Sequence, residues 1–327
     1  MASGIVSHDT EKRMVLVSGR AHPELAEAVA GELECELVPT SAFDFANGEI
    51  YVRFSESVRG AFAFCLQSHT APINKWIMEH LIMCDALKRA SARSITAIAP
   101  FYGYARQDKK HRGREPISAR LMADLFETAG ATRLMSVDLH TAQIQGFFNG
   151  PVDHLWSLPI LANYVRTRVD RSRLTVVSPD AGRVRLADQW SDWLGAPLAI
   201  IHKRRDPAVA NKVRVHELVG EVDGRTCVIV DDMIDTAGTI IEAAQALAKN
   251  GASQVLVAAT HAVLSGPAVD RLADSAISEV VVTDTLPIDE DKRIGKLTVL
   301  SIAPLIARAI REVFDDGSVT SLFDGNA

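Results

Sequence analysis

Short apolar runs alternate along this chain with longer segments in which apolar residues recur every three or four positions. The short runs are typical of buried strands, and the longer segments are typical of amphipathic helices. Their alternation predicts an α/β fold with open, mainly parallel sheets flanked by helices. In the first half, strands are expected near Val15–Ser18, Ala61–Gln67, Ile95–Pro100 and Leu134–Val137, and helices near Pro23–Leu33, Asn74–Ala90 and Ser118–Ala129.

The second half shows the same alternation. Its strands are expected near Leu174–Val177, Leu198–Ile201, Cys227–Val230, Val255–Ala259, Val280–Thr283 and Val299–Ile302, and its helices near Leu158–Val169, Val184–Leu194, Ile240–Lys249 and Pro304–Phe314. Each half therefore has enough elements for one sheet, and Asn149-Gly150-Pro151 is typical of a boundary. We expect two domains, residues 1–156 and 157–327, with the C-terminal helix and tail packing back on the first domain.

Composition agrees with two globular domains. The chain has 327 residues, of which 47% are hydrophobic and 23% charged, and this length favours two hydrophobic cores. The net charge of −6 argues against general nucleic-acid binding, which needs a positive surface. Residues 1–13 lack the apolar core of a signal peptide, and no run approaches membrane-spanning length, so we expect a soluble, cytoplasmic protein without membrane contact.

The four cysteines show no metal-ligand spacing. Cys65 and Cys227 have apolar neighbours, which indicates buried free thiols. Disulfides are therefore not expected.

The strongest chemical signal is an apolar strand that runs into Asp231 and Asp232 and then into a turn of small residues, 235–239. The backbone N–H groups of such a turn, together with the N-terminus of the following helix, can bind a phosphate. Two carboxylates cannot serve a phosphate, so hydroxyls or a metal are their natural partners. A 5-phosphorylated sugar offers a phosphate at one end and vicinal hydroxyls at the other. The alternative is an ordinary strand-turn-helix corner with solvated acids.

Three further strand ends carry candidate ligands. Residues 101–110 are aromatic and basic, and Arg106 can bind a phosphate bidentately while Gln107 offers an amide. Asp138 and His140 follow the next strand. They are candidates for metal ligands or phosphate partners, and the alternative is a structural role. Asp180 follows a strand of the second half, where a carboxylate suits Mg²⁺.

Two more segments have weaker patterns. Residues 43–49 combine aromatic, amide and carboxylate groups that can stack on and read an adenine, although Asn-Gly is also a common turn. Residues 202–206 contain three consecutive cations, which form either a solvated basic loop or a lid over a polyphosphate.

Together and in this order, these segments resemble the ribose-phosphate pyrophosphokinase family in its phosphate-activated bacterial and animal class. The resemblance runs from about Val15 to Phe323 and rests on the strings RQDKK, DLHTAQIQGFF, SPDAG, HKRRD and VDDMIDTAGT. It implies two phosphoribosyltransferase-like domains, a homohexamer, and transfer of the pyrophosphoryl group of Mg-ATP to ribose 5-phosphate. The products would be 5-phosphoribosyl 1-pyrophosphate (PRPP) and AMP.

The resemblance also implies roles for individual residues. It assigns ATP binding to Phe45, Asn47, Glu49, Arg106, Gln107 and His140, and Mg²⁺ binding to His140 and Asp180. It assigns ribose 5-phosphate binding to Asp231, Asp232, Asp235, Thr236, Ala237, Gly238 and Thr239, and it makes Lys203 and Arg205 catalytic cations. Regulation by inorganic phosphate and ADP is assigned to Ser57, Arg59, Arg114, Ser318 and Thr320.

The chain departs from the family pattern at two positions. Ala237 stands where many members have glycine, and a positive φ there would strain the backbone. Asn149 stands where many have aspartate, which weakens any metal role for that position. Two other functions stay open: a phosphoribosyltransferase, which would leave Arg106 and Gln107 unused, and a non-catalytic regulatory homologue.

Overall fold

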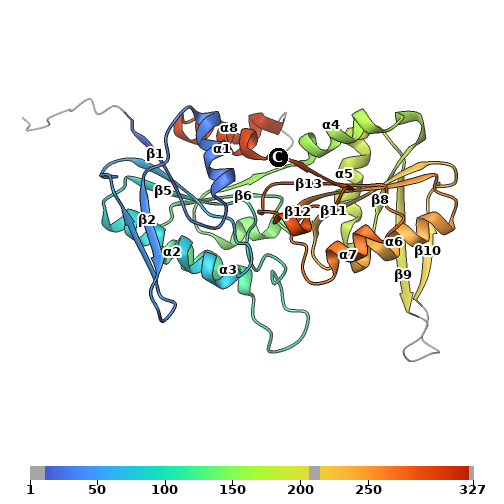
Figure 1. Ribbon diagram of the computed structural model, residues 1–327, viewed down its shortest axis with the longest axis horizontal. Helices are drawn as coiled ribbons and strands as arrows, with labels where there is room; N and C mark the ends of the chain where they lie inside the picture. The colour runs from blue at the N-terminus through green and yellow to red at the C-terminus, as the bar shows by residue number, and fades with distance from the viewer. Residues whose placement is uncertain (1–11, 206–213, 324–327) are drawn as a thin grey trace, which may run out of the picture.

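The computed structural model describes residues 12–205 and 214–323, and for 203–205 and 214–216 it describes the backbone alone. Two sheets lie side by side along the longest axis (Figure 1). The first is wholly parallel and has the order β1 (Met14–Ser18), β4 (Phe62–Leu66), β5 (Ser94–Ala99), β6 (Arg133–Val137), β7 (Val152–Leu155).

The second sheet has seven strands. Its order is β10 (Arg214–Val219), β9 (Leu198–Arg205), β8 (Leu174–Ser178), β11 (Thr226–Ile234), β12 (Gln254–Ala262), β13 (Glu279–Thr283), β14 (Leu297–Leu300). All neighbours are parallel except the edge strand β10, which pairs antiparallel with β9. The central strand β11 is buried over most of its length, as its continuous apolar run requires.

Helices cover both faces of each sheet (Figure 1). The first sheet packs against α2 (Ile73–Arg89) and α3 (Ser118–Ala129) on one face and against α1 (Pro23–Leu33) and α8 (Ala303–Phe314) on the other. The second sheet packs against α6 (Gly238–Lys249) and α7 (Ala268–Ala273) on one face and α4 (Leu158–Arg168) and α5 (Val184–Leu194) on the other. The predicted α/β class is therefore confirmed.

The C-terminal helix α8 belongs to the core of the first sheet. It lies against α1, and Ile302, Ile306 and Ile310 share a buried cluster with Leu16 and Phe64. The chain thus returns to its first half after completing the second sheet. The division at residues 156 and 157 stays a prediction. No helix in the described ranges is long and apolar enough to cross a membrane.

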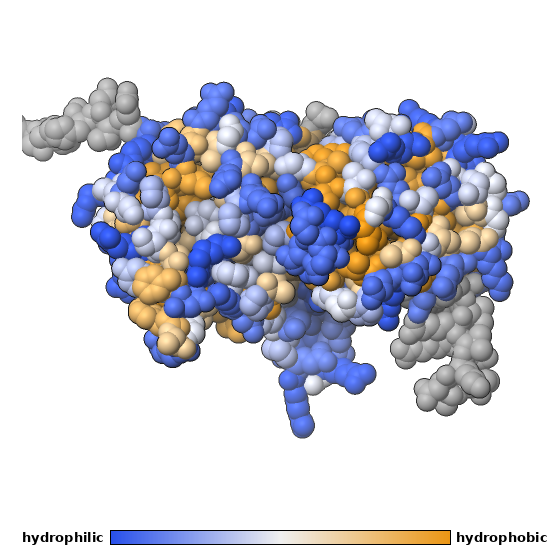
Figure 2. Space-filling model, viewed as in Figure 1, coloured by the Kyte–Doolittle hydropathy of each residue, from blue (hydrophilic) through white to orange (hydrophobic). Residues whose placement is uncertain are grey.

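A separate hairpin projects from the first half. It consists of β2 (Thr40–Asp44) and β3 (Ile50–Phe54), which pair antiparallel around an Asn47-Gly48 turn. Phe43, Phe45 and Tyr51 form an aromatic cluster on it and are 46%, 48% and 37% exposed. Figure 2 shows apolar residues gathered at the tip of this hairpin.

Candidate functional site

The acid pair, Asp231 and Asp232, lies inside β11. The sequence pattern predicts that it follows the strand, so this position is a correction. Asp231 is in register with Ala259 of β12, and the strand continues to Ile234. The turn therefore begins at Asp235, and α6 begins at Gly238. The pattern misplaced the strand end because acids are rare in buried strands.

A cavity of about 230 Å³ unites the acid pair with the turn. Its lining contains all seven residues predicted for ribose 5-phosphate, and also predicted ATP and metal residues from other strand ends. The lining residues are Arg106, His140, Asp180, Arg183 and residues 231–240. The carboxyl ends of parallel strands thus meet at one site, as expected for open α/β sheets.

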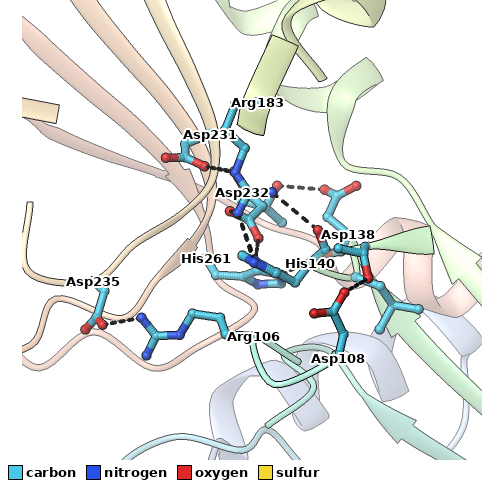
Figure 3. Close-up of polar contacts among 12 residues, drawn as sticks. Arg106, Asp108, Asp138, His140, Arg183, Asp231, Asp232, Asp235 and His261 are labelled. Carbon is cyan, nitrogen blue, oxygen red and sulfur yellow. Dashed lines mark hydrogen bonds and ion pairs between the residues drawn. The ribbon is translucent and has the colours of Figure 1, made fainter. Parts of the chain in front are cut away.

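Arg106 reaches this cavity from the loop after β5. Its Nη1 lies 2.6 Å from Oδ2 of Asp235, in an ion pair that joins the first half of the chain to the predicted phosphate turn, residues 235–239 (Figure 3). Burial alone would raise the pKa of Asp235, but hydrogen bonds from Ser265 and Arg106 outweigh it and lower that pKa. Gln107 is not among the lining residues.

A buried pair of histidines anchors the loop that carries Arg106. The Gly103 N–H donates to Nδ1 of His69 (2.9 Å), so Nε2 of His69 carries the proton and donates to Nδ1 of His80 (3.2 Å). Nε2 of His80 then donates to the Cys65 carbonyl (3.1 Å). Burial lowers the pKa of His80 to about 3, so the ring stays neutral.

This hydrogen-bond chain also excludes a metal site in the core. Donor atoms of Cys65, His80 and Cys84 all lie within 4.8 Å of one another. Both ring nitrogens of His80 are engaged, however, so no lone pair is left for an ion. All four cysteines are free, as predicted, and Cys65, Cys84 and Cys227 are buried.

His140 contacts two charged residues through the same ring nitrogen. Its Nδ1 lies 2.7 Å from Oδ2 of Asp232 and 2.8 Å from Nη2 of Arg183. One nitrogen cannot both donate and accept, and the shorter contact with a buried carboxylate favours a proton on Nδ1. The lone pair is then on Nε2, which lies 3.4 Å from Nη2 of Arg183. A histidine whose Nδ1 is held by a carboxylate in this way can bind a metal through Nε2 when the arginine moves aside.

Asp138 is not part of the cavity around the turn. Its carboxylate accepts hydrogen bonds from the Ser157 hydroxyl (2.5 Å), the Ser157 N–H (3.1 Å) and the Thr260 hydroxyl (2.6 Å). Thr260 belongs to β12, so Asp138 ties the end of β6 to the second sheet. These contacts favour the structural role that the sequence left open for Asp138, which also lines a larger cavity beside His140.

Arg183 is a cavity residue that the sequence pattern did not reveal. It ends the short turn 181–183, in which Asp180 accepts a hydrogen bond from the Gly182 N–H (2.8 Å). Its Nε lies 2.9 Å from Oδ1 of Asp231, and its Nη2 lies 2.8 Å from Oδ1 of Asp232. No spacing rule distinguishes Arg183 from the exposed Arg185 two residues later.

The two acids have opposite pKa shifts. Burial, and then the charge of Asp232, raise the pKa of Asp231 well above its usual range. Burial opposes ionisation of Asp232 too, but the hydrogen bond from His140 and the charge of Arg183 lower its pKa to about 2. Asp232 is therefore the firmly ionised member of the pair.

Ala237 has a positive φ. The backbone at this position is therefore strained, because alanine stands where many family members have glycine. Its φ and ψ are 60° and 0°, and it is the N-cap residue of α6. An alanine in the left-handed region costs roughly 1–2 kcal/mol, whereas glycine reaches it freely. The phosphate turn therefore stores backbone strain.

Replacing Ala237 by glycine is expected to leave the free energy of unfolding unchanged or to raise it by up to about 1 kcal/mol, because relieved strain offsets the greater freedom of the unfolded chain. Ala28→Gly, at an exposed position in helix α1, should lower it by about 1 kcal/mol. Urea unfolding of both variants tests this. If both variants lost the same free energy of unfolding, Ala237 would not be strained.

The hairpin residues predicted for ATP lie away from the cavity. Phe45, Asn47 and Glu49 stand at the hairpin end, where the Glu49 N–H donates to Oδ1 of Asn47 (3.2 Å). None of them lines the cavity. Figure 1 places the hairpin and helix α6 in different halves of the molecule.

The basic run at residues 203–205 lies in strand β9 and not on a loop, which corrects the prediction. Lys203 is paired with His216 of β10, and Arg205 with Arg214. The side chains of Lys203 and Arg205 lie outside the described part of the structure, as does Asp206.

The predicted effector residues occupy separate places. Ser57 and Arg59 follow β3, Arg114 lies on the loop before α3, and Ser318 and Thr320 follow α8, where their hydroxyls lie 2.8 Å apart. Within 12–205 and 214–323, no hydrogen bond or ion pair joins these groups.

Asn149, which stands where many family members have aspartate, binds Glu127 through its N–H (2.7 Å) and its side-chain amide (3.0 Å).

Comparisons with known proteins show which family this chain resembles. Residues 14–130 match the family described as the N-terminal domain of ribose phosphate pyrophosphokinase, and residues 198–324 match the phosphoribosyl synthetase-associated domain. Ribose-phosphate pyrophosphokinase of Streptomyces coelicolor is 72% identical over 96% of this chain and 97% of the relative. That of Mycobacterium tuberculosis is 62% identical over 98% of each chain.

A solved structure is also similar. The crystal structure of phosphoribosylpyrophosphate synthetase from Mycobacterium smegmatis superposes with a TM-score of 0.88 and 60% sequence identity. The match covers 94% of this chain and all of that chain.

Proposed function

The chain belongs to the ribose-phosphate pyrophosphokinase family, and we propose on this premise how its side chains carry out the reaction. The enzyme makes PRPP by transferring the pyrophosphoryl group of ATP to ribose 5-phosphate, with AMP as the other product. The observation that carries our assignment is the cavity in which the phosphate turn, the acid pair, Arg106 and His140 meet.

Ribose 5-phosphate binds with its phosphate at residues 235–239. The N–H groups at the start of α6, which point out of an uncapped helix N-terminus, bind the phosphate oxygens. Asp231 and Asp232 accept hydrogen bonds from the sugar hydroxyls at the other end of the cavity. Arg106, already within 2.6 Å of Asp235, adds positive charge beside the phosphates.

ATP binds between Arg106, Gln107 and His140, with its adenine on the aromatic hairpin. Phe45 is 48% exposed at the hairpin end and lies away from the cavity of its own chain, so a second copy must supply it. We therefore propose that the enzyme is a homo-oligomer, a homohexamer, in which one copy's Phe45, Asn47 and Glu49 serve a neighbour's site. An exposed aromatic cluster is typical of such a contact.

Mg²⁺ fits the donors at the cavity. With a proton on Nδ1, His140 offers the lone pair of Nε2, and Asp180 offers a carboxylate on the same cavity wall. We propose that these two residues hold the ion, which neutralises phosphate charge when it is bound. Asn149, engaged with Glu127, has no part in it.

The reaction asks little covalent chemistry of the protein. The anomeric hydroxyl attacks the β-phosphorus of ATP, the bond to the α-phosphate oxygen breaks, and AMP leaves with that oxygen. Positioning and cations that meet the spreading charge supply most of the acceleration. Lys203 and Arg205 are the proposed catalytic cations, and no group is assigned as the base. ATP and sugar phosphates are intracellular metabolites, which supports a cytoplasmic location.

Formation of AMP from ATP plus ribose 5-phosphate tests this function. A phosphoribosyltransferase would consume PRPP without making AMP, and a regulatory homologue would make no AMP alone. We expect AMP to appear only when both substrates and Mg²⁺ are present. Unchanged nucleotide in the complete mixture would contradict the proposal.

Inorganic phosphate activates the enzyme and ADP inhibits it, we propose, at a site formed between copies. Ser57, Arg59, Arg114, Ser318 and Thr320 lie apart in one chain, so assembly must bring them together. Arg59→Ala should abolish activation by phosphate while the KM values change little. The exposed Arg173 provides the control Arg173→Ala. Normal phosphate activation of Arg59→Ala would remove Arg59 from the site.

A further inference from the structure

Arg183 occupies a position that none of the assigned roles uses. Its guanidinium contacts Asp231 and Asp232 of β11 and also His140 (Figure 3). Its side chain is 18% exposed, and those of Asp231 and Asp232 are 13% and 6% exposed. Two adjacent carboxylates buried to this degree repel each other unless a cation compensates them.

The contacts of Arg183 fix both acids in place. Nε binds Asp231 and Nη2 binds Asp232, so one planar group spans the pair. The Asp232 N–H also donates to Oδ1 of Asp231 (2.8 Å), on the same oxygen that Arg183 contacts. Figure 3 shows the other oxygen of Asp231 pointing away from Arg183. The arginine therefore holds one oxygen and leaves the other for a ligand.

Asp232 is held in a complementary way. Its Oδ2 accepts a hydrogen bond from Nδ1 of His140 (2.7 Å), and its buried Oδ1 lies 2.8 Å from Nη2 of Arg183. Both oxygens of Asp232 are therefore fixed by neighbouring side chains.

Arg183 also lines two cavities. The cavity at the phosphate turn and a larger one of about 690 Å³ have four lining residues in common, His140, Arg183, Asp231 and Asp232. Arg183 therefore forms part of the wall at the acid end of the cavity proposed for ribose 5-phosphate.

We propose that Arg183 is a positioning residue that determines sugar specificity, because it orients Asp231 and Asp232 to read the vicinal hydroxyls of ribose. This inference rests on the proposed binding of ribose 5-phosphate at residues 231–239. A sugar without the 2-hydroxyl leaves one acid oxygen without its donor, and such a loss discriminates strongly. The enzyme should therefore prefer ribose 5-phosphate to 2-deoxyribose 5-phosphate, and the preference should depend on Arg183.

The test measures kcat/KM for both sugars in the full-length protein, Arg183→Gln, Arg183→Lys and the exposed control Arg173→Gln. In Arg183→Gln the preference for ribose 5-phosphate should shrink about tenfold or more, and its KM for that sugar should rise more than its KM for ATP. Arg183→Lys should recover only part of the preference, because a single ammonium cannot span both acids as the fork does. Arg173→Gln should keep the parental preference.

Calorimetric titration of each sugar in the absence of ATP, with melting temperatures, separates a positioning role from a purely structural one. Loss of affinity for ribose 5-phosphate with little loss for the deoxy sugar supports the inference. A parental sugar preference in both Arg183 variants would overturn it, as would an equal loss for both sugars. Parental protein that forms PRPP without preferring ribose would refute the hydroxyl-reading role of the acids, whereas parental protein that forms no PRPP would refute the proposed function.

Discussion

Replacing Lys203 by alanine is expected to lower kcat on the order of 10²-fold or more, with a much smaller rise in the KM for ATP. The charge on the phosphates spreads only as the transition state forms, so a cation that meets it then acts on kcat. Arg205→Ala should behave in the same way. The two residues stand at alternate positions of β9.

Steady-state rates against both substrates measure this effect. Lys203→Arg should rescue only partly, because a planar fork does not reproduce a compact ammonium. Lys249→Ala, at the exposed end of α6, is the matched control and should retain the parental kcat. If Lys203→Ala also kept the parental kcat, the basic run would be an ordinary segment of strand β9 without a catalytic role.

The second large effect concerns the acid pair. Asp231→Asn is expected to weaken ribose 5-phosphate binding roughly 10- to 150-fold, the range that corresponds to losing one charged hydrogen bond. Asparagine preserves the shape of the side chain but removes the ion pair with Arg183, whose Nε lies 2.9 Å from Asp231. ATP binding should change much less, because its proposed contacts are elsewhere.

Calorimetry with each ligand separates the two affinities. Asp188→Asn, at an exposed position of α5, removes the same charge and should change neither. The raised pKa of Asp231 adds a pH dependence: its ionised form, which accepts both hydroxyl and guanidinium hydrogen bonds, is lost as the pH falls. The affinity of the parental protein should therefore decrease on acidification, more than that of Asp231→Asn.

The main elements were predictable because each carries a strong local pattern. Helices α1 and α3 begin and end where the sequence predicts, α1 with a proline in its first turn and α3 with Gly130 in the left-handed conformation after its end. The β2–β3 hairpin was missed because its strands are half exposed and carry aromatic and charged residues on both faces. Strand β10 was missed because its pairing with β9 is a tertiary contact that periodicity does not reveal.

The candidate site was predictable where one segment holds several ligands. Residues 231–239 form one wall of the cavity, and strand ends brought His140 and Asp180 to it. Arg183 was not predictable, because its role arises from contacts with residues about fifty positions downstream and forty upstream. The conformation of Ala237 is likewise a property of the turn and not of alanine, which alone favours negative φ.

Transfer of a radioactive label from ATP tests the central claim most directly. With ATP labelled in its γ-phosphate and ribose 5-phosphate in excess, pyrophosphoryl transfer moves the label into the sugar product as AMP is released in equal amount. We predict that nearly all the label enters PRPP and little appears as free inorganic phosphate. Label released as phosphate together with ADP, or label that stays in ATP, would contradict the account.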